Sequence, residues 1–233
     1  MSLKPLKKSD LGKDWVSGRR SKKVKLQPEY HLIVTEGTDT EPAYFDEIRR
    51  IINESYRDRI QLDIEGKGDN TISLFEKAKR KAFESPNDYR HVWVVYDTDD
   101  FPAEHINKTK TLCEQNTNSE ICFHAIWSNQ CIELWFLLHF GYYQADIHRS
   151  EYWPKLTEWL TNIGKGEYKK NRSDMYSVLR PYIDVAINNA KRLDKTNAGR
   201  TPADSSPGTK VYELVEYLKP YLGASQSLCK PPN

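Results

Sequence analysis

Short apolar runs rich in β-branched residues alternate with segments of helical periodicity, and this alternation constrains the fold more than any other feature. Two runs are continuous, YHLIV (30–34) and HVWVVY (91–96), as expected for strands buried on both faces of a parallel sheet. Further strands are predicted at residues 60–64 and 121–127. Strands that alternate with helices predict an α/β fold with a mostly parallel four-stranded sheet flanked by helices.

Polar turns and helix caps divide the rest of the chain. Helices are predicted at residues 41–56, 70–84, 103–115 and 131–140, with Thr40 and Asn70 as N-caps of the first two. After residue 143 the strand pattern stops, and three helices are expected near 153–163, 173–193 and 209–222. The expected organisation is a basic flexible leader (1–27), an α/β catalytic domain (28–145), a helical extension packed on it (146–223) and a disordered tail (224–233).

The net charge of +2 is unevenly distributed. Residues 1–27 contain nine Lys and Arg but only two acidic residues, a local charge of +7 that leaves −5 for residues 28–233. Such a leader suits contact with phosphates, while an acidic body suits carboxylates gathered around a cation. A solvated leader without a partner remains an equal alternative.

Four cysteines are spaced too widely for a zinc knuckle and include no C-x-x-C pair. We therefore expect the cysteines to be reduced thiols. Because no apolar run approaches the ~20 residues that a membrane-spanning helix needs, and the first 25 residues lack the apolar stretch of a signal peptide, we expect a cytoplasmic protein without a membrane partner.

Polar side chains follow three of the four predicted strands. Glu36 follows the first, Asp97 and Asp99 the third, and Ser128 and Asn129 the fourth. Ligands of open parallel sheets bind beyond the carboxyl ends of the strands, so one cleft is expected to collect these groups. Carboxylates held that close repel one another unless a cation lies between them, and Mg²⁺ or Mn²⁺ bound by a few carboxylates and by substrate phosphates fits this pattern.

Two further carboxylates are candidate metal ligands. Glu41, at the start of a predicted helix, either binds a cation or only favours the helix dipole. Glu133 lies in the apolar segment 131–140, where a buried carboxylate is costly without a partner. Alternatively, Glu133 lies on the exposed face of that helix and binds no metal.

The segments TEGTDTEPAYF (35–45), DTDDF (97–101) and SNQCIELWFLLHF (128–140) resemble the RloB-like family, and the glutamate followed by a later D-x-D resembles the Toprim signature. The resemblance spans most of the chain. Gln130 departs from it, because a proline is expected there. The resemblance implies a Toprim-like Rossmannoid fold and a metal-dependent nuclease of antiphage defence. Such proteins belong to abortive-infection or restriction loci and often have an ATPase partner.

Carried over by position, the resemblance implies Glu36 as metal ligand or general base, Asp97 and Asp99 as the principal Mg²⁺ ligands, and Ser128, Asn129 and Glu133 completing the site. Lys170, or its neighbour Lys169, is the candidate for steadying charge on the transferring phosphate, with a solvated loop lysine as the alternative. Lys67, between two glycines, is a candidate phosphate contact, although such a segment is more often only a turn.

Three functions remain open on the sequence. A nuclease acting on DNA or RNA is favoured, because Lys and Arg of the leader suit a phosphate polymer. The alternatives are a nucleic-acid- or nucleotide-binding subunit of a defence complex that does not cleave, and a hydrolase of a nucleotide or another small phosphoester. A topoisomerase or primase would need further modules, for which 233 residues leave little room.

Overall fold

The computed structural model describes residues 29–64, 70–98 and 101–223. Within these ranges a single sheet has the strand order β2-β1-β3-β4-β5. The predicted leader and tail, and the candidate residues Lys67 and Asp99, lie outside the described residues.

The four predicted strands are present and pair in parallel. They are β1 (Tyr30–Thr35), β2 (Ile60–Ile64), β3 (Tyr89–Asp97) and β4 (Cys122–Asn129). The prediction of a mostly parallel α/β fold is therefore confirmed. A fifth strand was not predicted: β5 (Gly208–Thr209) comes from the C-terminal part and pairs antiparallel with the end of β4.

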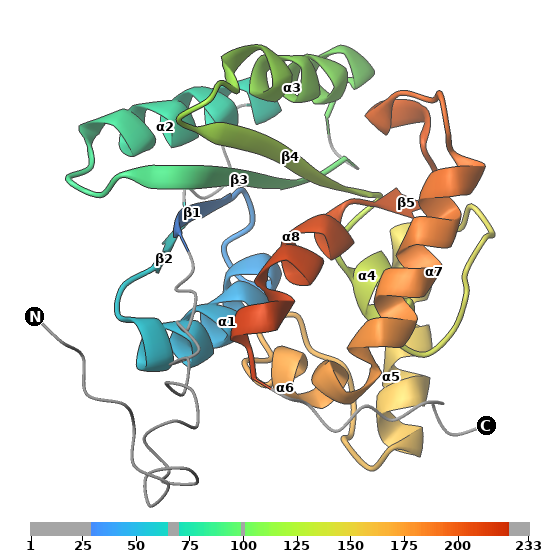
Figure 1. Ribbon diagram of the computed structural model, residues 1–233. Coiled ribbons are helices and arrows are strands. Elements are labelled where there is room, and N and C mark those ends of the chain that lie inside the picture. Colours follow the sequence, from blue (N-terminus) through green and yellow to red (C-terminus); the bar gives the residue numbers. More distant parts are fainter. Residues whose placement is uncertain (1–28, 65–69, 99–100, 224–233) are drawn as a thin grey trace, which may run out of the picture.

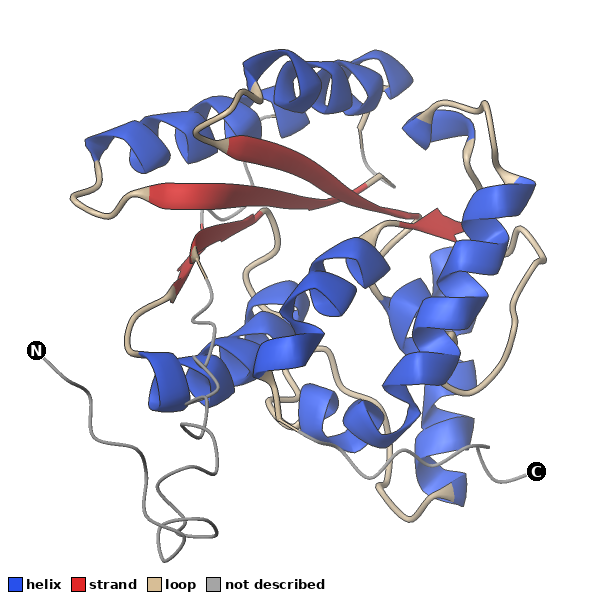
Figure 2. Cartoon of the chain, in the orientation of Figure 1, coloured by secondary structure: helices blue, strands red, loops and turns tan. Residues whose placement is uncertain are grey.

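Helices cover both faces of the sheet (Figure 1; Figure 2). On one face lie α2 (Thr71–Glu84) and α3 (Ala103–Asn116), packed on Leu32, Val34 and Val94. The other face packs against α1 (Thr40–Tyr56) and α8 (Val211–Leu218). Because side chains alternate along a strand, Trp93 and Val95 of β3 point to this second face, and Asp97 continues their row.

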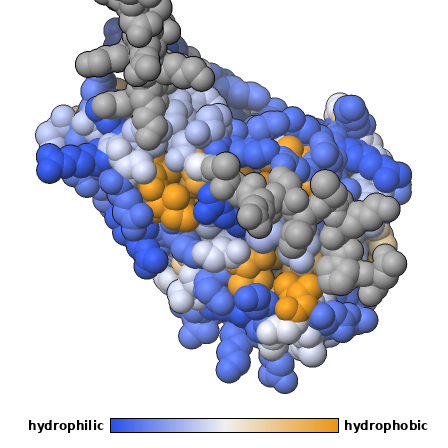
Figure 3. All heavy atoms as spheres, turned by 60° about the horizontal axis from the view of Figure 1, so that its bottom comes forward, coloured by the Kyte–Doolittle hydropathy of each residue, from blue (hydrophilic) through white to orange (hydrophobic). Residues whose placement is uncertain are grey.

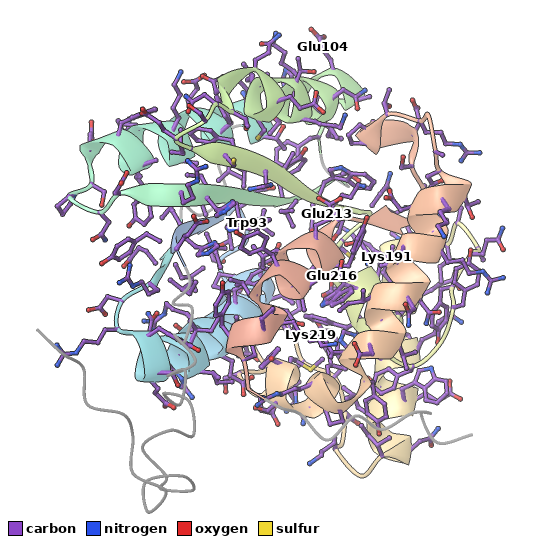
Figure 4. All side chains as sticks on the ribbon, in the orientation of Figure 1. Trp93, Glu104, Lys191, Glu213, Glu216 and Lys219 are labelled. Atoms are coloured by element: carbon purple, nitrogen blue, oxygen red, sulfur yellow. The ribbon has the colours of Figure 1, made fainter. Side chains whose placement is uncertain are left out.

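The C-terminal helices share the core of the second face. They are α4 (Glu133–Leu137), α5 (Tyr152–Asn162), α6 (Met175–Leu179), α7 (Ile183–Thr196) and α8. Buried side chains of these helices form one cluster with Ile33 of β1 and with α1, so the sheet and the C-terminal part share one core. The ion pair between Lys191 of α7 and Glu216 of α8, 2.6 Å between Nζ and Oε1, joins two of them on the surface (Figure 4).

Several predicted element bounds were wrong for identifiable reasons. The predicted helix at residues 173–193 is interrupted by a 3₁₀ turn, Arg180–Tyr182, because Pro181 has no N–H to donate and clashes with the preceding turn. The apolar segment 131–140 forms only the five-residue α4, with turns on both sides. The cap of α1 is Asp39 rather than Thr40, and no side chain caps that helix end. Asn70 caps α2 as predicted, its side chain accepting a hydrogen bond from the Ser73 N–H at 2.8 Å.

None of the helices in the described ranges is long and apolar enough to cross a membrane. On the face turned forward in Figure 3, apolar surface forms small patches among hydrophilic side chains. The large hydrophobic side chains that are exposed in the described part of the chain are Phe83, Trp153 and Tyr217.

Candidate active site

The strand order reverses between β1 and β3, because the chain leaves β1 for β2 on one side and returns to β3 on the other. In open α/β sheets, ligands bind at the carboxyl ends of strands at such a switch point. Glu36 follows β1, and Asp97 ends β3. The N–H of Glu36 donates to the carbonyl of Val95 at 3.1 Å. This hydrogen bond holds Glu36 against β3, two residues before Asp97.

The turn after β1 leads directly into α1 and carries a third carboxylate into the same place. Glu41 lies in the first turn of α1 and is only 6% exposed. Gly37 makes room for it, since a Cβ atom on Gly37 would overlap the Glu41 carboxylate and force that side chain to shift.

Glu133 is the fourth carboxylate, at the first residue of α4, and is 3% exposed. It is therefore buried rather than exposed, and two hydrogen bonds to it come from the C-terminal part of the chain. Tyr168 Oη donates to Oε1 at 2.8 Å, and Trp153 Nε1 donates to the same oxygen at 3.2 Å.

A pocket at the carboxyl ends of the strands brings these groups together. Its lining includes these four carboxylates, the carboxylate of Asp39 and, from the C-terminal part, three further side chains: Glu36, Asp39, Glu41, Asp97, Glu133, Arg149, Trp153 and Lys170. Most of the predicted site residues that the structure describes thus line one cavity.

Burial and mutual repulsion perturb two of the carboxylates. Burial, with the charges of Glu41, Glu133 and Glu36 next in importance, raises the pKa of Asp97 well above its usual range. Burial likewise raises the pKa of Glu41 to about 7, against the lowering effect of the helix backbone and of Lys170. Strong shifts in a cleft with a specific charged partner are typical of functional sites.

Cys131 also lines the pocket but is not a candidate nucleophile. Burial and the nearby carboxylates of Glu133 and Asp97 raise the pKa of its thiol far above the usual range. The thiolate is the nucleophilic form, so this cysteine remains an unreactive thiol at neutral pH.

The donor chemistry of the pocket fits a hard divalent cation, because its buried donors are carboxylate oxygens whose repulsion a cation would relieve. Among the described residues, no group of three or more His, Cys, Asp and Glu side chains is arranged to hold a metal ion as it stands. Asp99, predicted as a principal ligand, lies outside the described residues. The pocket therefore supplies suitable ligands, and closing them around an ion would require side-chain rotation or a further ligand.

Two positive side chains line the pocket. Lys170 is exposed, and its Nζ lies 4.7 Å from the centroid of the Trp153 ring. Arg149 is partly buried and also lines a neighbouring pocket formed in part by Thr98, Asn129 and Gln130. Cationic groups at this position can meet a phosphate whose ester lies against the carboxylates.

Ser128 and Asn129 do not line the carboxylate pocket in the described structure. Ser128 is 1% exposed, and its hydroxyl pairs with that of Thr209 in β5 at 2.8 Å. The Asn129 side-chain amide donates to the carbonyl of Ala203 at 3.2 Å, and its side chain lines the neighbouring pocket. Both side chains thus attach the C-terminal segment to β4, and their predicted contact with substrate stays a prediction.

Sequence reasoning missed three residues of the site: Arg149 and Trp153, which line the pocket, and Tyr168, which donates to Glu133. They lie beyond the predicted α/β domain, in segments without strand pattern. An available signal was Glu133 itself, since a buried carboxylate requires donors and the aromatic C-terminal part offers indole and phenol groups.

A family model described as RloB-like protein matches residues 31–218 of the chain. The match includes the five carboxylates of the pocket and the three residues from the C-terminal part. Neither the curated proteins nor the solved structures give a significant match.

Proposed function

The chain belongs to the RloB-like protein family, and we propose that it is a metal-dependent nuclease that hydrolyses nucleic-acid phosphodiesters in antiphage defence. One observation carries the proposal. Five carboxylates converge at the switch point of a parallel sheet, in a pocket that Lys170 and Arg149 also line.

In this proposal the carboxylates of Glu36, Asp97 and Glu41 hold Mg²⁺ or Mn²⁺, with Asp99 as a further ligand. Burial and repulsion favour the protonated forms of Asp97 and Glu41, so cation binding must displace protons from them. Glu133, which Tyr168 and Trp153 orient, is a further candidate ligand of the cation. A bound divalent cation supplies Lewis-acid polarisation of the phosphoryl oxygen.

The remaining groups act on the substrate. Lys170, at the exposed side of the pocket, steadies the charge that develops on the phosphate, and Arg149 binds a neighbouring phosphate between the two pockets. The basic leader adds sequence-independent affinity for a nucleic-acid polymer. Lys67, Ser128 and Asn129 remain candidate substrate contacts.

The second candidate is a non-cleaving nucleic-acid- or nucleotide-binding subunit of a defence complex. It is favoured by the absence, among the described residues, of a ligand set that could hold a metal without rearrangement. In either case, an ATPase from the same locus is the proposed partner.

A substrate panel distinguishes the candidates. Purified chain is incubated with Mg²⁺ or Mn²⁺ and with single-stranded DNA, duplex DNA, RNA or nucleoside triphosphates. Cleavage of a polymer supports the nuclease, release of phosphate from a nucleotide alone supports a small-phosphoester hydrolase, and binding without cleavage, with the ATPase partner also present, supports the binding subunit.

A further inference from the structure

Trp153 occupies an unusual position for a large aromatic residue. It is 40% exposed, although it lines the carboxylate pocket, and it is the second residue of α5. The other two large hydrophobic side chains exposed in the described part of the chain, Phe83 and Tyr217, do not line this pocket. An exposed indole beside a charged pocket calls for a role other than filling the core.

The ring is held in place from several sides. Its Nε1 donates to Glu133, the Lys170 ammonium lies 4.7 Å from the ring centroid, and the adjacent Tyr152 is 1% exposed and anchors the start of α5. A side chain fixed in this way loses little conformational freedom when a ligand binds it.

The hydrogen bond to Glu133 does not by itself explain an indole here. Tyr168 already donates to the same carboxylate oxygen over a shorter distance, 2.8 Å against 3.2 Å. What Trp153 adds is an exposed π surface at the edge of a pocket that Lys170 and five carboxylates line. Base–aromatic stacking beside a cationic group is the usual way in which proteins hold single strands.

Resting on the proposed nuclease function, we propose that Trp153 is a stacking platform for an unpaired nucleobase next to the scissile phosphate. Bases inside a duplex are stacked on one another, so a base can reach this ring only from a single strand or a locally unpaired segment. The substrate class is therefore single-stranded or unpaired nucleic acid, and Lys170 beside the ring meets the phosphate of the stacked nucleotide.

Binding without cleavage tests this directly. The full chain is titrated, in EDTA, against oligothymidylate and oligouridylate of roughly ten nucleotides and against abasic oligomers with the same backbone and number of phosphates. Equal phosphate numbers remove the electrostatic contribution from the comparison. The expected result is a preference of about 5- to 150-fold for the oligomer that carries bases, and weaker binding of a duplex.

Three variants locate the effect. Trp153→Leu is expected to abolish the preference, whereas Trp153→Phe, which keeps a ring but loses the donor to Glu133, retains part of it. Phe83→Leu removes a remote exposed aromatic residue and leaves the preference unchanged. Equal binding of base-carrying and abasic oligomers by the unsubstituted chain, no binding of either, or a preference that persists in Trp153→Leu would overturn the inference.

The outcome is separable from the nuclease proposal, because the titration contains no cation. A chain that prefers bases but never cuts contradicts the proposed activity and keeps the stacking role. One that cuts but shows no preference for bases keeps the activity and loses the stacking role.

Discussion

Tyr168 donates a hydrogen bond to Glu133, 2.8 Å between Oη and Oε1, and so connects the C-terminal part of the chain to the carboxylate pocket. Burial and the Glu133 charge raise the pKa of the phenol far above its usual range, so Tyr168 remains a donor at all working pH values. The orientation of Glu133 therefore depends on a residue 35 positions away in sequence.

Tyr168→Phe removes that donor and keeps the ring. Cleavage is expected to fall by about 10- to 100-fold, the usual cost of losing a partner that orients a metal ligand. The rate is measured over a range of Mg²⁺ concentrations. Tyr143→Phe is the matched control, because Tyr143 Oη accepts from Trp159 Nε1 at 2.7 Å and does not line the pocket. Equal losses in both variants would show that Tyr168 acts only on the fold.

Gly37→Ala is expected to displace Glu41 from the pocket, since the new Cβ would overlap its carboxylate. The variant should lose as much Mg²⁺ affinity as Glu41→Gln, and combining both changes should cost little more than either. Isothermal titration measures the affinities. Gly141→Ala, whose Cβ would meet only the Tyr143 ring at 3.5 Å, is the control. Additive losses would mean that Gly37 acts independently of Glu41.

Asp97→Asn is expected to stabilise the metal-free chain. The pKa of Asp97 is raised, so its ionised form is unfavourable in the folded state, and an uncharged Asn keeps an acceptor for the Ile132 N–H. The expected gain in the free energy of unfolding is roughly 1 kcal/mol, which corresponds to a rise of about 2–4 °C in Tm. Thermal unfolding with and without Mg²⁺ measures it, with exposed Asp88→Asn as control. A lower Tm in the Asp97 variant without metal would contradict the repulsion.

The raised pKa of Glu41 makes the stability of the metal-free chain depend on pH in a direction that can be stated. Its folded-state pKa is raised to about 7 from about 4.5, so the folded chain binds more protons than the unfolded chain between these values. Stability of the metal-free chain should therefore fall as pH rises from about 4.5 to 7, and Glu41→Gln should remove this part of the slope. Urea unfolding at several pH values, compared between the two proteins, measures the difference. An unchanged slope in the variant would count against burial of the charge.

Titration of His31 makes the stability of the folded chain change with pH in the opposite direction. Burial, and next the charges of His91 and His124, lower its pKa to about 3 from 6.5, while Trp93 Nε1 donates to its Nδ1 at 3.1 Å. The unfolded chain binds the additional proton, so stability falls as pH drops below 6.5, by up to about 1.4 kcal/mol per pH unit. His31→Gln should lose that part of the slope in urea unfolding. His148→Gln, which removes an exposed histidine, is the control.

The sequence allowed prediction of features that depend on local patterns. Buried strands were recognisable from continuous β-branched runs, and Asn70 from its position before a helical pattern. Residues at strand ends were expected to converge because parallel strands share a carboxyl edge. Glu36 directly follows β1, and Asp97 ends the neighbouring β3.

Features created by contacts between distant segments could not be predicted. The two-residue β5 exists through pairing of Gly208 and Thr209 with the end of β4, about 80 residues earlier, and no local pattern marks it. The same holds for the approach of Tyr168 to Glu133. By contrast, the break at Pro181 could have been predicted from the sequence, since proline interrupts a helical pattern.

The proposed nuclease activity is tested most directly by nucleic-acid cleavage by the chain and by its Asp97→Ala variant, at increasing Mg²⁺, with circular dichroism to verify that both are folded. We expect cleavage that requires the cation in the unsubstituted chain and falls by at least about 100-fold in the variant. Cleavage that persists at full rate without the Asp97 carboxylate, or without any divalent cation, would contradict it.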